Sequence, residues 1–94
     1  MLKTEKIENI VEIPKFAVMF SAPWCGPCKP AKIALDEICR EKGIPAFVID
    51  ADENPGQAEK YNVSGLPTIL IFEDGKLIDM ITGKISIDEL RSII

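Results

Sequence analysis

The 94-residue sequence predicts an α/β fold in which a mixed four-stranded sheet carries helices on both faces. Two wholly apolar segments, residues 16–20 and 46–49, flank a segment with helical spacing. Such runs are typical of strands covered on both sides, and a helical crossover makes the two strands parallel. A further pair of apolar runs flanks Asp74-Gly75, which indicates an antiparallel hairpin. The length suits one domain, so we expect residues 1–94 to fold as a single unit.

The N-terminal half contains a short helix, the first strand and a long helix. Residues 4–12 carry apolar side chains at helical spacing and precede Pro14, which predicts a short amphipathic helix. The apolar run at 16–20 is the first strand. Helical spacing then extends over residues 27–42, and Gly43 directly after them is a typical helix stop.

The second strand, residues 46–49, leads into another short helix. Asn54 is a residue type that favours the N-cap position, and Pro55 suits the first position of a helix. We expect this helix to end near Tyr61.

The C-terminal part contains the hairpin and a last helix. The hairpin strands are residues 68–72 and 76–81. Residues 86–89, with the sequence SIDE, match a capping box, and Ile85 and Leu90 are spaced as its hydrophobic staple. The last helix is therefore expected to run from this box to the end of the chain.

Composition and charge exclude several classes of protein. The net charge is −4 and no cluster of Lys and Arg is present, which argues against nucleic-acid binding. The apolar run at 16–20 is too short to cross a bilayer, so no membrane association is expected. The first ten residues alternate charged and apolar groups, unlike a signal peptide, and we expect a cytoplasmic protein. The chain has no histidine, which removes the commonest general base and metal ligand.

Cys25 and Cys28 form a Cys-x-x-Cys pair between the first strand and the long helix. A thiol at that place faces unpaired backbone N–H groups and the positive end of the helix dipole, which favour the thiolate. Because the thiolate is the nucleophile, we expect Cys25 to be reactive at neutral pH. Cys28 lies about one turn further on, close enough to displace a group attached to Cys25.

A structural staple and a metal site are the alternatives for the pair. A disulfide across so few residues constrains little of the unfolded chain. Zinc needs four ligands, and the only other cysteine, Cys39, lies eleven residues beyond Cys28 on the same predicted helix. Redox chemistry is therefore the favoured interpretation, no metal is expected, and Cys39 is expected to be a small buried side chain.

Three motifs together resemble the thioredoxin family. They are WCGPCK at residues 24–29, GLPT at residues 65–68 and Asp74-Gly75, and they occur in register with the predicted strands and helices. The resemblance extends from about Phe16 to the end of the chain and implies the thioredoxin fold. It also implies a thiol–disulfide oxidoreductase that reduces protein disulfides through a Cys-Gly-Pro-Cys dithiol/disulfide cycle.

The resemblance also implies a role for each site residue. Cys25 is the attacking thiol, Cys28 is the buried resolving thiol, and Leu66-Pro67 is a cis peptide whose backbone binds an extended substrate segment by strand addition. The remaining residues implied to contact substrate are Trp24, Gly26, Pro27, Gly65 and Gly83.

Partners and cofactors follow from the same resemblance. Disulfide-containing proteins are the implied substrates, a thioredoxin-reductase-like protein is the electron donor, and the protein is expected to be a monomer. No bound cofactor is expected, because the redox group is the Cys25–Cys28 disulfide. The alternative function is a binding subunit that keeps the fold but does not need the cysteines.

The chain departs from the family pattern at several places. Met19 stands where thioredoxins commonly bury an aspartate, and Val48 stands where its companion lysine would lie. We expect Cys28 to lose its proton through water or to the leaving thiolate, with slower resolution as the result. Lys84 adds a positive charge beside Gly83, and no counterpart of the family's first edge strand is evident.

Overall fold

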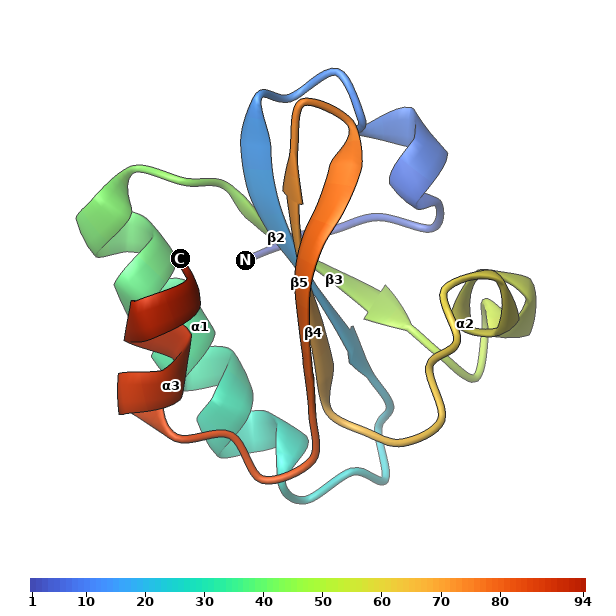
Figure 1. The fold of residues 1–94 in the computed structure, drawn as a ribbon. Helices are drawn as coiled ribbons and strands as arrows, with labels where there is room; N and C mark the ends of the chain where they lie inside the picture. The colour runs from blue at the N-terminus through green and yellow to red at the C-terminus, as the bar shows by residue number, and fades with distance from the viewer.

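A five-stranded mixed sheet forms the centre of the protein in the computed structural model, which describes residues 1–94 (Figure 1). The spatial order is β1-β3-β2-β4-β5. The first three strands in that order are parallel, and β4 and β5 are antiparallel to their neighbours. The strands are β1 (Leu2–Lys3), β2 (Lys15–Ser21), β3 (Ala46–Asp50), β4 (Thr68–Glu73) and β5 (Lys76–Thr82).

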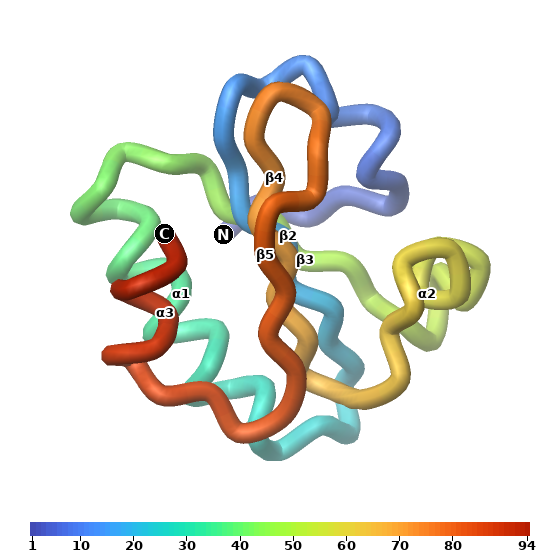
Figure 2. Tube along the Cα trace, viewed as in Figure 1, coloured from blue at the N-terminus to red at the C-terminus, as the bar shows by residue number.

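Helices cover both faces of the sheet, as predicted. Figures 1 and 2 show α1 (Cys28–Lys42) and α3 (Ile87–Ile93) together on one side of the strands. The short helix α2 (Pro55–Lys60) and the 3₁₀ turn η1 (Ile7–Asn9) lie on the opposite side. No helix is both long enough and apolar enough to span a bilayer.

The central strand β2 divides the core into two apolar clusters. Successive side chains of a strand point to opposite faces, so both faces of β2 are buried. The α1-side cluster consists of Ala17, Met19, Ala22, Cys25, Cys28, Ala31, Leu35, Ile38, Cys39, Ala46, Ile69, Ile71 and Leu90. The α2-side cluster consists of Ile7, Phe16, Val18, Phe20, Phe47, Ile49, Leu70 and Phe72. The interpretation of residues 16–20 as a strand covered on both sides is confirmed.

The strand β1 corrects the prediction of four strands. Leu2 and Lys3 pair in parallel with Phe47 and Val48 of β3, which makes three parallel strands instead of two. Both residues of β1 are exposed and the strand is only two residues long. A pair of exposed residues produces no hydrophobic alternation, so the sequence pattern contained no signal for this edge strand.

The predicted helix over residues 4–12 is wrong, because only the 3₁₀ turn η1 forms there. Ile7 is fully buried in the α2-side cluster, and Ile10 and Val11 pack against that cluster from the loop after the turn. The backbone N–H of Ile7 donates to Oε1 of Gln57 at 2.9 Å instead of to a helical carbonyl. The apolar spacing therefore reflects burial and not an α-helix.

The remaining elements form where they were expected, with ends that differ by one residue. Asp74 and Gly75 have positive φ angles of 52° and 79°, as a tight hairpin turn requires. Gly43 ends α1 in the left-handed conformation at φ 68°. Oγ of Ser86 accepts a hydrogen bond from the N–H of Glu89 at 3.1 Å, which confirms the predicted cap of α3.

Candidate active site

Three loops meet at one end of the sheet, the lower end in Figures 1 and 2. They connect β2 to α1, α2 to β4, and β5 to α3. A hydrogen bond of 2.9 Å from the N–H of Gly83 to the carbonyl of Pro67 joins the last two loops. Leu66 packs against the α1-side cluster, which contains both Cys25 and Cys28. The fold therefore brings the WCGPCK and GLPT motifs together although they are far apart in the sequence, whereas Asp74-Gly75 forms the β4–β5 turn elsewhere.

Cys25 and Cys28 form a disulfide, with Cα atoms 5.4 Å apart. The N–H of Cys25 donates to the carbonyl of Ala22 at 3.1 Å, which turns the chain after β2. Cys28 is the first residue of α1. The pair therefore lies between a buried strand and a helix N-terminus, as the sequence predicts.

The two sulfur-bearing side chains are nearly buried in this disulfide form. Cys25 is 5% exposed and Cys28 is 3% exposed. The expected contrast between a reachable Cys25 and a buried Cys28 is therefore small in the oxidised protein. Both residues nevertheless line a hollow of about 480 Å³, here called the site hollow.

The site hollow brings charged groups from three segments next to the cysteines. Its wall includes Val48, Ser21 and, near the disulfide, Ala22 and Pro23. The other residues around it are Lys3, Thr4, Glu5, Cys25, Cys28, Lys29, Lys32, Asp50, Glu53 and Asn54. The hollow was not predicted from the sequence, because its charged residues come from β1 and the segment after it, from α1, and from the end of β3 and the loop after it.

Met19 and Val48 are neighbours across the β2–β3 pair. Met19 is fully buried in the α1-side cluster, and Val48 is half-buried at the wall of the site hollow. Two apolar side chains therefore occupy the positions where the resemblance implies a charged pair. Replacement of a buried ion pair by packed apolar groups is often neutral or favourable for stability.

Trp24 belongs to the loop that precedes α1. Its side chain is 69% exposed, and its Nε1–H donates to Oδ2 of Asp52 at 2.7 Å. Gly26 and Pro27 are also exposed, and a side chain at Gly26 would meet no atom within 4 Å. Asp52 was not identified from the sequence, since nothing in its local pattern connects it with the tryptophan.

The Leu66-Pro67 peptide bond is cis, as the resemblance implies. Neither the N–H nor the carbonyl of Leu66 is hydrogen bonded within the chain. The hydroxyl of Thr68 donates to the carbonyl of Gly65 at 2.6 Å, which fixes the loop before β4. Gly83 has a φ of 94°, a conformation that favours glycine.

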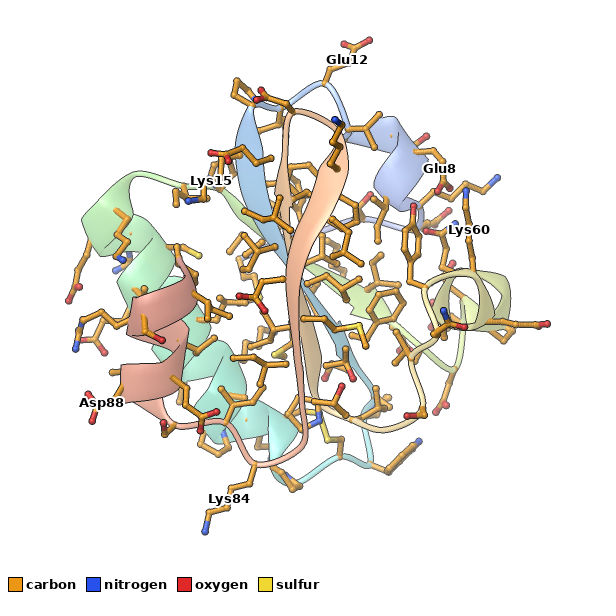
Figure 3. All side chains as sticks on the ribbon, in the orientation of Figure 1. Glu8, Glu12, Lys15, Lys60, Lys84 and Asp88 are labelled. Carbon is orange, nitrogen blue, oxygen red and sulfur yellow. A yellow bond between two sulfur atoms is a disulfide. The ribbon has the colours of Figure 1, made fainter.

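Two further residues singled out from the sequence lie outside this arrangement. Cys39 is buried on α1, as expected, and is not part of a disulfide. Lys84 is exposed and points away from the protein (Figure 3). No three Cys, Asp or Glu side chains are grouped in a way that would hold a metal ion.

Comparisons with known proteins agree with this fold and site. The thioredoxin family profile matches residues 2–94. The chain is 34% identical over 85 residues to thioredoxin 1 of Synechococcus elongatus, which covers 88% of this chain and 77% of that protein. It is 40% identical over 85 residues to thioredoxin 1 of Nostoc sp., with the same coverage of 88% and 77%. A mutant thioredoxin from Halobacterium salinarum superposes with a TM-score of 0.90 at 27% identity, over 99% of this chain and 86% of that one.

The fold and the cysteine pair thus define a protein of the thiol–disulfide oxidoreductase class. The chain belongs to the thioredoxin family. Its activity is the reduction of protein disulfides, and the binding-subunit alternative is not favoured, because the two cysteines already form the disulfide that the cycle requires.

Proposed function

We propose that Cys25 is the attacking thiol and Cys28 the resolving thiol of this cycle. The thiolate of Cys25 attacks a substrate disulfide and forms a mixed disulfide, and one substrate sulfur leaves. Cys28 then attacks the sulfur of Cys25, which releases the second substrate sulfur and closes the intramolecular disulfide. The single observation that carries this assignment is the Cys25–Cys28 disulfide at the N-terminus of α1, where the helix dipole favours a thiolate.

We further propose that substrate binds along Leu66 as an added strand. The free N–H and carbonyl of this residue support the proposal, because an extended segment satisfies both groups. Trp24, Gly26, Pro27, Gly65 and Gly83, together with Pro67, complete the proposed docking surface. The exposure of Trp24 and the open space over Gly26 support close approach of a partner chain.

The cellular setting belongs to the same proposal. The protein acts in the cytoplasm as a single-domain monomer over residues 1–94, and a thioredoxin-reductase-like donor returns it to the dithiol. It needs no bound cofactor and acts on neither nucleic acid nor membrane. The net charge of −4 and the absence of a basic cluster support the exclusion of nucleic acid.

Insulin reduction by dithiothreitol tests the assignment of the attacking thiol. The unaltered protein is expected to accelerate insulin precipitation, and Cys25→Ser is expected to reduce the rate to background. Cys39→Ser is the matched control and is expected to keep full activity. Equal rates for the parent and the Cys25→Ser variant would instead support the binding-subunit function.

Trapping tests the assignment of the resolving thiol. Cys28→Ser leaves the attacking thiol intact, so mixed disulfides with substrate proteins are expected to accumulate and to disappear on treatment with dithiothreitol. Release of substrate by Cys28→Ser at the parent rate would contradict the role given to Cys28.

A further inference from the structure

The resolving step requires Cys28 to lose a proton from a nearly buried position. Cys28 is 3% exposed and belongs to the α1-side cluster, whose members are all apolar residues or cysteines. Met19, the cluster residue at the position where the resemblance implies an aspartate, has no group that accepts a proton. The proton of Cys28 therefore has no acceptor on the core side.

The site hollow is the polar side of Cys28. Its volume of about 480 Å³ is far larger than the roughly 10–15 Å³ that one water molecule needs, and its wall is rich in charged groups, so it is suited to hold water. Because the chain has no histidine, the groups at the hollow that accept a proton at neutral pH are carboxylates. These are Glu5, Asp50 and Glu53.

Asp50 is the carboxylate that the fold holds in place. Glu5 and Glu53 are exposed, whereas Asp50 is half-buried at the end of β3, paired with Ser21 of β2. Its Oδ1 accepts from the N–H groups of Asp52 and Glu53 at 2.9 and 3.2 Å.

The backbone of Asp50 is also held by hydrogen bonds. Its carbonyl accepts hydrogen bonds from the backbone N–H and from Nδ2 of Asn54, both at 3.0 Å. Oδ2 of Asp50 makes no hydrogen bond and no ion pair within the chain. The carboxylate thus keeps one oxygen free while the other positions it.

The cations at the hollow favour the negative charge that proton loss creates. Lys3 is the last residue of β1, and Lys29 and Lys32 lie in the first two turns of α1. None of the three forms an ion pair with a carboxylate within 4.0 Å. Together with Glu5 and Glu53, they are the other charged groups that line the hollow with Cys28 and Asp50.

We infer that Asp50 accepts the Cys28 proton through water in the site hollow. It would thus take the role of the buried aspartate that the resemblance implies at the position of Met19. The thiol proton passes to Asp50, and the Cys28 sulfur bonds to the Cys25 sulfur while the bond from Cys25 to the substrate sulfur breaks. The substrate sulfur leaves with the electron pair as a thiolate, and Asp50 later returns its proton to solvent. The protein dithiol is oxidised and the substrate disulfide is reduced. This inference rests on the proposed roles of Cys25 and Cys28.

DTNB, an aromatic disulfide that releases a yellow thiolate, separates the two steps in a stopped-flow experiment on the reduced protein. The first release reports attack by Cys25 and depends on the DTNB concentration. The second release reports resolution by Cys28 and does not. With Asp50 as acceptor, the second rate is expected to change little between about pH 6 and pH 8, because the proton passes to a group of the protein and not to hydroxide.

Asp50→Asn removes the acceptor and keeps the geometry, since an amide oxygen still accepts from the two N–H groups. Resolution is expected to slow by about 100-fold near neutral pH, at the lower end of general-base contributions. In the Asp50→Asn variant, the rate of resolution is expected to rise about tenfold per pH unit, because the Cys28 thiol must ionise without an acceptor in the protein. The first release is expected to stay unchanged. A variant rate within about twofold of the parent rate would overturn the inference.

Two controls and the parent protein complete the test. Glu53→Gln changes an exposed carboxylate at the same hollow, and Asp79→Asn changes an aspartate on β5 whose Oδ1 accepts from the N–H of Met80. Both are expected to resolve at the parent rate, and loss of resolution in Glu53→Gln would move the assignment away from Asp50. A tenfold rise per pH unit in the parent itself would overturn the inference without any variant. Absence of the first release would instead refute the role proposed for Cys25.

Discussion

The three cysteines share one apolar cluster but differ in chemical surroundings. Cys25 and Cys28 line the site hollow, whose wall contains charged and polar groups. Cys39 lies deeper along α1, and burial together with the negative charge of Asp36 raises its pKa to about 11. Only the first two thiols are therefore suited to chemistry at neutral pH.

Thiol counting tests this difference. The reduced native protein is expected to release two equivalents of yellow thiolate rapidly with DTNB near pH 8, because Cys39 is buried and un-ionised. The third equivalent is expected only after unfolding in guanidinium chloride. Cys39→Ser should leave the native count unchanged and abolish the third equivalent. A rapid third equivalent in the native protein would contradict the burial of Cys39.

Glu8 connects the N-terminal segment to α2 (Figure 3). Its carboxylate accepts hydrogen bonds from Nζ of Lys60, from the hydroxyl of Tyr61 and from Nε2 of Gln57. These bonds, the one from Lys60 above all, lower the pKa of Glu8 to about 2. Burial and the bond to Glu8 raise the pKa of Tyr61 to about 12.

Acid titration of stability tests the Glu8 bonds. A carboxylate whose pKa is lowered by folding stabilises the folded state. For Glu8 this stabilisation is fully present above pH 4.5, the ordinary pKa of the group, and is lost as the pH falls toward about 2. Glu8→Gln is therefore expected to be less stable than the parent at pH 6, with a difference that narrows between about pH 5 and pH 2. The difference should stay below about 1 kcal/mol, because the pair is largely exposed to solvent and screened.

Urea unfolding at several pH values measures this difference. Glu12→Gln is the control, since Glu12 is exposed and makes no ion pair or side-chain hydrogen bond. A difference between Glu8→Gln and the parent that does not depend on pH would show that the charge of Glu8 is not the stabilising factor.

At the scale of elements, the short motifs that specify caps and turns were more reliable than the apolar spacing of residues 4–12. The capping box at Ser86, the stop at Gly43 and the turn at Asp74-Gly75 each specify a local backbone geometry, and each forms as expected. Residues 4–12 contain apolar side chains that become buried, but no motif that specifies a helix. Packing against β2 and hydrogen bonds to α2 satisfy that pattern without a helix.

Ser86→Ala tests the cap of α3. Loss of the bond from the N–H of Glu89 is expected to lower the free energy of unfolding by about 1 kcal/mol in urea titrations. Ser92→Ala is the matched control, because the hydroxyl of Ser92 donates to the carbonyl of Glu89 within the same helix and caps nothing. An equal loss in the two variants would show that hydroxyl bonding in general, and not capping, stabilises α3.

At the scale of the whole molecule, the proposal of one domain predicts a single cooperative transition. Far-UV circular dichroism follows the sheet and helices, and the fluorescence of Trp24, the only tryptophan, follows the site. The two signals are expected to give the same urea midpoint in the oxidised protein. Separate midpoints would show that the site loops unfold independently of the sheet.

The family motifs made much of the site predictable, whereas the features that depend on tertiary contacts were not. Cys25, Cys28 and Pro67 lie in short motifs that specify their own local structure. Asp50 becomes noticeable only when β1, α1 and β3 come together around the site hollow. The strand β1 was missed for a similar reason, because two exposed residues are defined by their partner strand and not by their own pattern.

The sulfur atoms of the active pair also belong to the packing that holds α1 against the sheet. The midpoint potential of the pair is therefore linked to the difference in stability between the oxidised and reduced forms. If Leu35→Val loosened the oxidised form more than the dithiol, by about 1.4 kcal/mol, the midpoint potential would rise by about 30 mV. Leu35 is fully buried and lines neither the site hollow nor the docking surface. A substitution in the interior, away from the site hollow and the proposed docking surface, is therefore expected to change the midpoint potential when it affects the two redox forms unequally.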